Sequence, residues 1–273
     1  AGSACGKALG AVPSTTVGYE KVRNWALQYD NDEQGFVQYL LADQPEPPKY
    51  FAMMKKLNKV DRPLLTEVPV LKKLSASDLK EAMEKGMKVL DARDKVDFAA
   101  GFIPGSMNIQ GNNSFATWAG WFLKYDEQFI ILADESKLDD LTRKLMRIGL
   151  DNIYGYVPST SVWTESGGKL EKANMISIEE AKKLMQEDVQ IVDLRGVAEY
   201  NSGHILNADN VFVGTLPQNL DKIRKDKKVL IHCQSGDRAA IGYSILVKNG
   251  FTNIANYSGG INEWVNRGEP LVS

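Results

Sequence analysis

The fold of this 273-residue chain is decided by one stretch, Val229-Leu230-Ile231-His232-Cys233-Gln234-Ser235-Gly236-Asp237-Arg238-Ala239-Ala240-Ile241-Gly242. Its first four residues form an apolar, β-prone run, and its tail follows a helical pattern that continues to Gly250. Cys233 therefore lies where we expect a strand to turn into a helix. The first N–H groups of a helix have no partner within it, and the helix dipole adds partial positive charge there. The sequence predicts an anion-binding loop at this point.

Cys233 is the candidate nucleophile of this loop. Cysteine thiols ionise more readily at helix N-termini than in free solution. We interpret Cys233 as a thiolate on a ring of backbone amides that also holds a charged group attached to its sulfur. The alternative is a buried structural cysteine, but the polar run Gln-Ser-Gly-Asp-Arg that follows is unlike the apolar surroundings of such thiols. The hypothesis requires a pocket open to solvent and amide hydrogens directed at the sulfur.

The length of the loop indicates which electrophile the thiolate attacks. From Cys233 to Arg238 the spacing is Cys-x4-Arg, one residue shorter than the Cys-x5-Arg loop of cysteine-dependent phosphatases. A longer loop encircles a tetrahedral phosphoryl group, whereas a shorter one leaves space for little more than one extra sulfur atom. The spacing therefore favours sulfur transfer, with Gly236 permitting the tight turn.

Several segments resemble rhodanese-family sulfurtransferases, beginning with HCQSGDRA, which is similar to their active-site loop. The resemblance implies that Cys233 is catalytic, that Gln234, Ser235, Gly236, Asp237 and Arg238 bind substrate, and that Asp193 and Arg195 support the loop. Arg238 has two open roles, holding the anionic group of the donor or pinning the loop to a carboxylate. The other matching segments are Ile191-Val192-Asp193-Leu194-Arg195, Glu199-Tyr200, Gly203-His204-Ile205, and Gly259-Gly260 with Trp264, Gly268 and Pro270.

Composition narrows the classes of partner. The chain is 43% hydrophobic and 25% charged with a net charge of −2, so nothing attracts it to nucleic acid or membranes in general. Cys5 and Cys233 do not suggest a disulfide scaffold, and a reducing cytoplasm is the simplest setting. His204 and His232 lack further ligands at metal-binding spacing, so we expect no metal or other cofactor in this chain.

The N-terminal region reads as a loop followed by helices at residues 16–29, 32–42 and 48–58. The segments GSACGKALGAVPSTTVGYEK and QPEPPKYF resemble the tail of the metallo-β-lactamase-fold domain in persulfide dioxygenase–rhodanese fusion proteins. The His-Gly pair that binds metal in that family is not present here. We therefore expect the chain to be a piece of a longer polypeptide, with a metal, expected to be iron, only in the missing domain. That domain is then a partner of this chain, and Cys5 is a structural residue of it.

The rest of the chain contains a duplication. Asp91 and Arg93 match Asp193 and Arg195, which lie 102 positions later, and Gly149, Asn152-Ile153 and Trp163 match Gly250, Asn253-Ile254 and Trp264 at an offset of 101. Helical patterns alternate with apolar runs in each copy. We predict an α/β protein with a helical tail of a metallo-β-lactamase-like domain at 1–65 and rhodanese-like domains at 66–173 and 174–273. Each of these two has a mostly parallel sheet flanked by helices, with Cys233 at the carboxyl end of a strand.

The first copy has the same pattern of predicted strands and helices but no cysteine at the matching loop. Opposite the Cys233 loop it has Ile130-Ile131-Leu132-Ala133-Asp134-Glu135-Ser136-Lys137, with no cysteine and two acidic residues that disfavour an anion. We expect this copy to be structural or an interaction surface. Its aromatic stretch from Phe115 to Tyr125 is expected to pack in the core.

The leading function is a sulfurtransferase that moves sulfane sulfur from thiosulfate or a persulfide to a thiol, sulfite or cyanide acceptor through a Cys233 persulfide. The partners on this reading are small sulfur donors and thiol acceptors, and a homo-oligomer is left open. The alternatives are a non-catalytic persulfide carrier or interaction module and a cysteine-dependent phosphatase or arsenate reductase. We expect His204 to bond to local backbone and His232 to point away from Cys233, so that neither is a catalytic base.

Overall fold

The computed structural model describes residues 14–42, 44, 46–61 and 65–273, and the chain divides into two compact units, residues 1–47 and residues 48–273. Cys5 lies outside the described residues. In the first unit, the side chains of Thr16 and Asp32 cap the starts of two helices. The single helix predicted over residues 16–29 is interrupted at Asn24, where an α-helix ends and a 3-10 helix begins. The aromatic rings of Trp25, Phe36 and Tyr39 cluster between these elements. The elements are α1 (Val17–Arg23), the 3-10 helix η1 (Trp25–Gln28) and α2 (Glu33–Leu41).

The third N-terminal helix, α3 (Tyr50–Leu57), belongs to the second unit. Its Tyr50 and Met54 side chains pack against the large core cluster of that unit. Gly120 makes this approach close, because a Cβ at that position would lie 2.3 Å from the Tyr50 ring. The side chains of Tyr50 and Met54 are therefore covered by the sheet domain that follows this helix.

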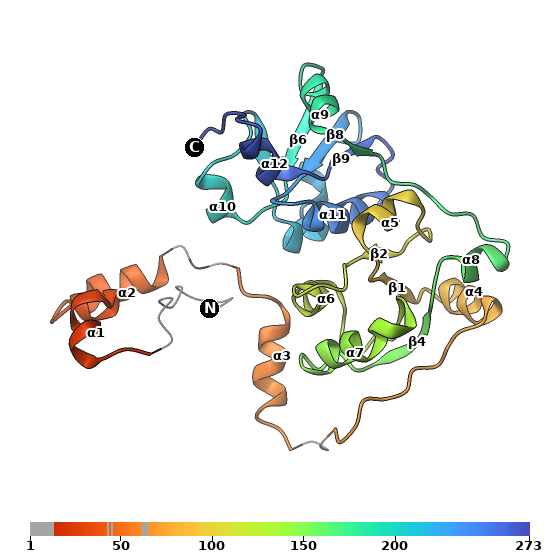
Figure 1. The fold of residues 1–273 in the computed structure, drawn as a ribbon, viewed down its shortest axis with the longest axis horizontal. Helices are drawn as coiled ribbons and strands as arrows, with labels where there is room; N and C mark the ends of the chain where they lie inside the picture. The colour runs from red at the N-terminus through yellow and green to blue at the C-terminus, as the bar shows by residue number, and fades with distance from the viewer. Residues whose placement is uncertain (1–13, 43, 45, 62–64) are drawn as a thin grey trace. The chain divides into compact units, whose positions relative to one another are not determined.

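The first sheet is formed by residues 66–173, the first half, and has the parallel strand order β2–β1–β3–β4. Every residue of β3 is buried, as expected for a central strand covered by helices on both faces. Figure 1 shows the helices of this half around its strands. The strands are β1 (Lys88–Asp91), β2 (Met107–Asn108), β3 (Phe129–Leu132) and β4 (Ile153–Val157), and the helices are α4 (Ala76–Glu84), α5 (Lys95–Ala100), α6 (Phe115–Phe122), η2 (Glu135–Lys137), α7 (Leu138–Met146) and α8 (Ser161–Glu165).

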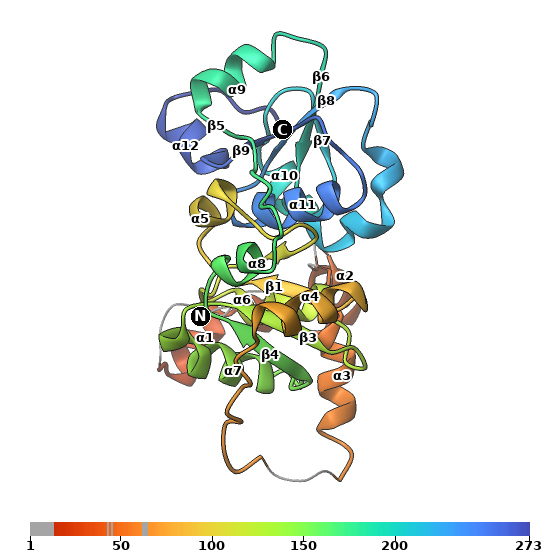
Figure 2. The same cartoon turned by 90° about the vertical axis from the view of Figure 1, so that its right-hand side faces the viewer.

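The second sheet is formed by residues 174–273, the second half, with the parallel order β5–β9–β8–β6–β7. The α/β prediction is confirmed, with two parallel, helix-flanked sheets. Helices α9 and α12 pack on one face of this sheet and α11 on the other, as Figure 2 also shows. The strands are β5 (Met175–Ile176), β6 (Val189–Asp193), β7 (Ala208–Asn210), β8 (Lys228–His232) and β9 (Ile254–Tyr257), and the helices are α9 (Ile178–Leu184), α10 (Val197–Asn201), η3 (Val213–Gln218), η4 (Leu220–Lys222), α11 (Asp237–Lys248) and α12 (Gly260–Asn266).

Helix α11 joins the two halves. All of its residues from Ala239 to Leu246 are buried, which a helix achieves only when it is covered on every side. The hydroxyl of Ser244 accepts the backbone N–H of Asn108 in β2 at 3.1 Å, and the Tyr243 ring meets Phe102 edge-on. In both views α11 lies on the side of its sheet that faces the first half (Figures 1 and 2). The largest hydrophobic core cluster therefore contains residues of both halves, while the outer face of each sheet has a cluster of its own.

The aromatic stretch of the first half packs at this same join. Trp118 and Trp121 of α6 contact the ring of Phe212, with ring centroids 6.2 and 5.4 Å apart. Phe115 is fully buried. The expected core role of these aromatic residues is confirmed, and the core they fill belongs to both halves.

Candidate active site

Cys233 follows β8 directly, and α11 begins four residues later at Asp237. Gly236 stands between them with φ of 94°, in the left-handed region that favours glycine. A Cβ there would lie 2.4 Å from the carbonyl oxygen of Ser258, so a larger residue does not fit. The strand-to-helix turn predicted at Cys233 is thus formed, and Gly236 permits it for both reasons.

The sulfur of Cys233 accepts one backbone hydrogen bond, from the N–H of Gly236 at 3.1 Å. Helix α11 has no side-chain cap. Among the described residues, no protein acceptor takes the N–H groups of Asp237, Arg238 or Ala239. The loop therefore has one amide on the thiol and a set of free donors at the start of the helix, where the dipole favours negative charge.

Cys233 is only 1% exposed and packs with the large core cluster. The pocket open to solvent that the sequence argument requires is not present in this conformation, so that expectation is wrong, and of the ring of amides it expects, the N–H of Gly236 alone bonds to the sulfur in the part of the chain that the structure describes. The next two residues are more accessible, since Gln234 is half-buried and Ser235 is exposed. The thiol therefore lies directly beneath a partly solvated loop.

The carbonyl groups of the loop are held by α12. The N–H of Ile261 donates to the Cys233 carbonyl at 2.9 Å, and the N–H of Asn262 donates to the Gln234 carbonyl at 3.0 Å. The side chain of Asn262 also pairs with the Gln234 amide. Gly260 has φ of 60°, and a Cβ on it would lie 2.4 Å from the Cys233 carbonyl oxygen. The Gly-Gly pair noted in the sequence thus allows the helix start to approach the loop backbone.

Arg238 forms a bidentate pair with Glu199 of α10, with nitrogen–oxygen distances of 2.5 and 2.7 Å. Burial alone would lower the pKa of Arg238, but the hydrogen bond and charge of Glu199 raise it above its usual value. Burial likewise acts to raise the pKa of Glu199, and the hydrogen bonds and charge of Arg238 outweigh it, so this pKa lies below its usual 4.5. Of the two roles left open for Arg238, this structure has the one in which the loop is pinned to a carboxylate.

Asp193 and Arg195 form a buried pair at the end of β6. Both Arg195 Nε and Nη2 bind the Asp193 carboxylate, Nη2 also donates to the Gly203 carbonyl at 2.7 Å, and Nη1 reaches the Gln234 side chain at 3.4 Å. Arg93 repeats the pairing with Asp91 and the bond to Gly101 in the first half. The pair is therefore part of the duplicated scaffold, and only the second copy touches a cysteine loop.

Neither histidine forms a hydrogen bond with the Cys233 sulfur. His232 is fully buried, and burial lowers its pKa below the usual 6.5. The ring of His204 stacks on Tyr200, and its Nδ1 lies 3.0 Å from the Tyr200 carbonyl oxygen. The local backbone role predicted for His204 is confirmed.

In the equivalent loop of the first half, a side chain caps the start of the helix that follows. Asp134 caps η2 by accepting the N–H of Ser136, and Glu135 pairs with Lys73. In the sheets Leu132 pairs with Asp91 as His232 pairs with Asp193, so the residue that follows β3 in the place of Cys233 is Ala133, one position later than the sequence comparison gives, and it is buried. The acidic residues noted in the sequence thus occupy the start of the helix that is left uncapped in the second half.

Sequence reasoning missed four residues that hold the site together. Glu199 lies in one of the segments that resemble the family, which by itself gives this residue no role, and in the structure it pairs with Arg238. Asn210 donates to the carbonyls of Asp193 and Arg195, as Asn108 does in the first half, and the repeat offset was the signal that could have found it. Lys95 and Asn112 reach the loop from the first half, and no local pattern marks them.

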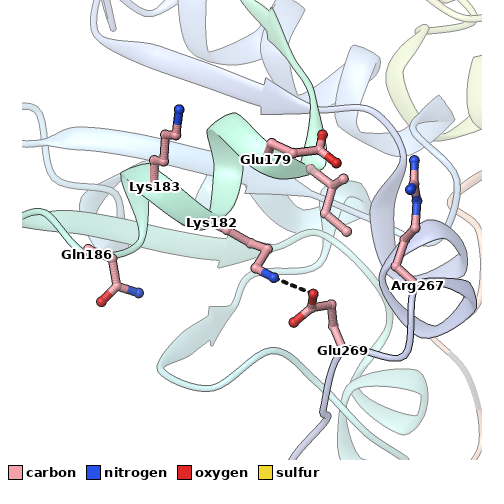
Figure 3. A pocket seen from close by; sticks show the side chains of 7 residues that line it. Glu179, Lys182, Lys183, Gln186, Arg267 and Glu269 are labelled. Atoms are coloured by element: carbon pink, nitrogen blue, oxygen red, sulfur yellow. Dashed lines mark hydrogen bonds and ion pairs between the residues drawn. The ribbon is translucent and has the colours of Figure 1, made fainter.

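A separate surface pocket of about 480 Å³ lies beside α9 and the end of α12, and Figure 3 shows the Lys182–Glu269 ion pair across it. None of the predicted site residues lines it. In the parts of the chain that the structure describes, no group of three His, Cys, Asp or Glu side chains could hold a metal ion. Over those same residues, no helix is long and apolar enough to cross a membrane.

The parallel, helix-flanked sheets of the two halves agree with a comparison of the sequence with protein families. The model of the rhodanese-like domain matches residues 75–166 and again residues 177–267, which together are more than half of the chain. The chain therefore belongs to the rhodanese-like family, with two copies of the domain.

The two similar proteins named next match this chain over about the length of one rhodanese-like domain. YqhL of Bacillus subtilis (strain 168) is 40% identical over 75 residues, which are 28% of this chain and 60% of that protein. A sulfurtransferase of Allochromatium vinosum is 36% identical over 87 residues, 32% of this chain and 81% of that protein. Among solved structures, a metallo-beta-lactamase of Staphylococcus aureus is 33% identical, with a TM-score of 0.47, over 55% of this chain and 42% of that chain.

Proposed function

We propose that this chain is a sulfurtransferase that carries sulfane sulfur on Cys233. The observation that carries the proposal is the Gly236 N–H bond to the Cys233 sulfur, at the mouth of a helix whose first N–H groups have no protein acceptor among the described residues. Free donors of this kind stabilise a sulfur anion and a second sulfur attached to it. Membership of the rhodanese-like family and the sulfurtransferase relative support the same chemistry.

The proposed cycle has two displacements. The Cys233 thiolate attacks the outer sulfur of thiosulfate, a sulfur–sulfur bond forms, and the original sulfur–sulfur bond breaks with its electron pair leaving on sulfite. The Cys233 persulfide then holds the transferred sulfur as an anion near the free N–H groups. A thiolate or cyanide attacks that terminal sulfur, the sulfur–sulfur bond of the persulfide breaks, and the Cys233 thiolate is regenerated.

Entry of the donor requires movement at the mouth of the loop, because Cys233 is 1% exposed. The side chains there are Gln234 and Arg238, which are tied to Asn262 and Glu199 respectively. We propose that these two polar contacts open to admit the donor, while the backbone bonds to α12 keep the loop in shape. The burial of the thiol also favours a second candidate, a carrier that receives sulfur from a protein partner.

The test combines three substrates. Incubation with thiosulfate and cyanide should give thiocyanate with the native chain and none with Cys233→Ser, while a chromogenic phosphate ester should not be turned over. Hydrolysis of the ester without thiocyanate would replace this proposal with a phosphatase. Persulfide that forms on Cys233 but never discharges to cyanide or small thiols would select the carrier.

We also propose that the chain forms part of a fusion with a metallo-β-lactamase-fold domain, in a reducing compartment such as the cytoplasm. The support is the resemblance of residues 2–21 and 44–51 to the tail of that domain and the need of a thiol nucleophile for reducing surroundings. An antibody raised against residues 174–273 should detect a native polypeptide well above 30.3 kDa. Detection at 30.3 kDa alone would contradict the fusion.

A further inference from the structure

The first half reaches the Cys233 loop through Lys95, the first residue of α5. Its Nζ donates to the carbonyl oxygen of Ser235 at 2.6 Å and to Oδ1 of Asp237 at 3.0 Å. These acceptors are two and four residues beyond the cysteine. The aliphatic part of Lys95 also packs on Gly236, because a Cβ added to Gly236 would lie 3.2 Å from both Cδ and Cε of Lys95. A residue of the half without a cysteine therefore lies directly on the loop that has one.

Asn112 makes a second contact from the same half. Its Nδ2 donates to Oδ2 of Asp237 at 2.8 Å, so both carboxylate oxygens of Asp237 are occupied by donors of the first half. Asn112 is itself held, since its Oδ1 accepts the N–H of Ser114 and its carbonyl accepts Lys144 Nζ. Asp237 begins α11, so these bonds fix the point at which the helix starts.

The charge of Asp237 matters because the proposed donor is an anion. A carboxylate at the loop would repel thiosulfate unless a cation offsets it. Lys95 provides this cation, and although burial alone would raise the pKa of Asp237, the hydrogen bond and charge of Lys95 help to hold it below its usual 3.8. The loop therefore keeps an ionised Asp237 whose charge is balanced by the first half.

The duplicated second half has no equivalent of this contact. The positions that match Lys95 and Asn112 at the offset of 102 are Val197 and Gly214, neither of which has a side-chain donor. Val197 is 60% exposed and caps no loop. The two copies of the domain have therefore diverged at the residues that meet the loop, and only the first copy has the donors.

Stability alone does not account for the contact. The Lys95–Asp237 pair is partly exposed, with side chains 23% and 34% accessible, and pairs of this kind contribute little to folding. The join between the halves is already made by the buried face of α11 against β2 and Phe102. We therefore expect that removing the Lys95–Asp237 contact leaves the packing between the two halves intact.

We propose that Lys95, together with Asn112, is a positioning residue of the Cys233 loop, supplied by the half that has no cysteine, and that it balances Asp237 so that the loop accepts an anionic donor. This inference rests on the proposed sulfur transfer for its role in turnover. It gives the first rhodanese-like domain a part in the chemistry of the second.

The experiment compares Lys95→Met with the matched control Lys88→Met. Lys88 pairs with Glu127 in the same half at similar exposure, 30% and 39%, and does not touch the loop. Two quantities are measured, kcat/KM with thiosulfate and the ratio of rates at which anionic iodoacetate and neutral iodoacetamide modify Cys233. Lys95→Met should lower both about tenfold, as expected for one uncompensated charge near a reacting anion at an effective dielectric constant of about 20.

The remaining variants separate charge from structure. Lys95→Arg should keep most of the activity, and adding Asp237→Asn to Lys95→Met should restore the iodoacetate ratio because the unbalanced charge is removed. If the native chain turns over thiosulfate and Lys95→Met has the same kcat/KM and the same alkylation ratio as Lys88→Met, the inference is overturned. A native chain that gives no thiocyanate, but whose alkylation ratio still falls in Lys95→Met, would contradict sulfur transfer and support the loop contact.

Discussion

At the scale of single residues, the proposed sulfur transfer depends on the backbone N–H groups around the Cys233 sulfur. One N–H, that of Gly236, bonds to the thiol, and the free donors of Asp237, Arg238 and Ala239 remain for a second sulfur. A ring of amides on the thiol itself, as the sequence argument expects, is not what this conformation has. The donors become useful only when a persulfide or a donor anion enters the loop.

Arg238 gives the first prediction at this scale. Glu199→Gln removes the carboxylate that holds it, and we expect the free energy of unfolding to fall by about 1 kcal/mol at pH 7, because Glu199 is 42% exposed and solvent screens the pair. The pKa of Glu199 is lowered in the fold, so its contribution is fully present above its usual 4.5 and is lost as the pH falls through the lower folded value.

The measurement is urea unfolding of the native chain and Glu199→Gln at pH 7, 5 and 3. The gap between them should be widest at pH 7 and should shrink between pH 5 and 3. A gap that is constant across this range would mean that the ionised pair contributes nothing specific to stability.

At the scale of elements, the loop is shaped by the two helices that meet it. Helix α11 begins beneath the loop with no capping side chain, and the first turn of α12 donates to the carbonyls of Cys233 and Gln234. The thiol side and the carbonyl side of the loop are thus held by different helices. Gly260 is the residue that lets α12 come this close.

Gly260→Ala tests this arrangement. The added Cβ would lie 2.4 Å from the Cys233 carbonyl oxygen, at a positive φ, so we expect a loss of about 1–3 kcal/mol in stability and much slower sulfur loading. The control is Gly268→Ala, which has φ of 76° but open space around its Cβ. Thiocyanate turnover and thermal unfolding should separate the two variants, and equal turnover would show that the loop does not need the close approach of α12.

At the scale of the whole second unit, the two halves share a core through α11. Phe102 stacks on Phe98 of the first half and meets Tyr243 of the second. One cluster of buried side chains includes residues of both sheets. The halves are therefore expected to unfold together although they arose as a repeat.

Phe102→Ala tests the shared core. Phe102 is 1% exposed, and truncation of such a ring costs about 3–5 kcal/mol. Hydrogen exchange should report the same loss of protection in α11 as in β1, although the substitution lies in the first half. Loss confined to β1, with α11 unchanged, would show two independently folding halves.

The sequence predicts the parts of this fold that local patterns encode. The apolar run of Val229 to His232 predicts strand β8 to within one residue of its bounds, Lys228–His232. Strands β2 and β7 were not predicted, since two or three residues carry no period. The contact of Lys95 with Asp237 spans 142 positions, and no spacing rule connects residues that far apart. The burial of Cys233 was missed because it depends on packing from both halves.

The central claim is that Cys233 carries one sulfur atom, and intact mass after thiosulfate treatment tests it most directly. The native chain should gain the mass of one sulfur atom, cyanide should remove it, and Cys233→Ser should gain nothing. An unchanged native mass, or an equal gain in Cys233→Ser, would contradict the account.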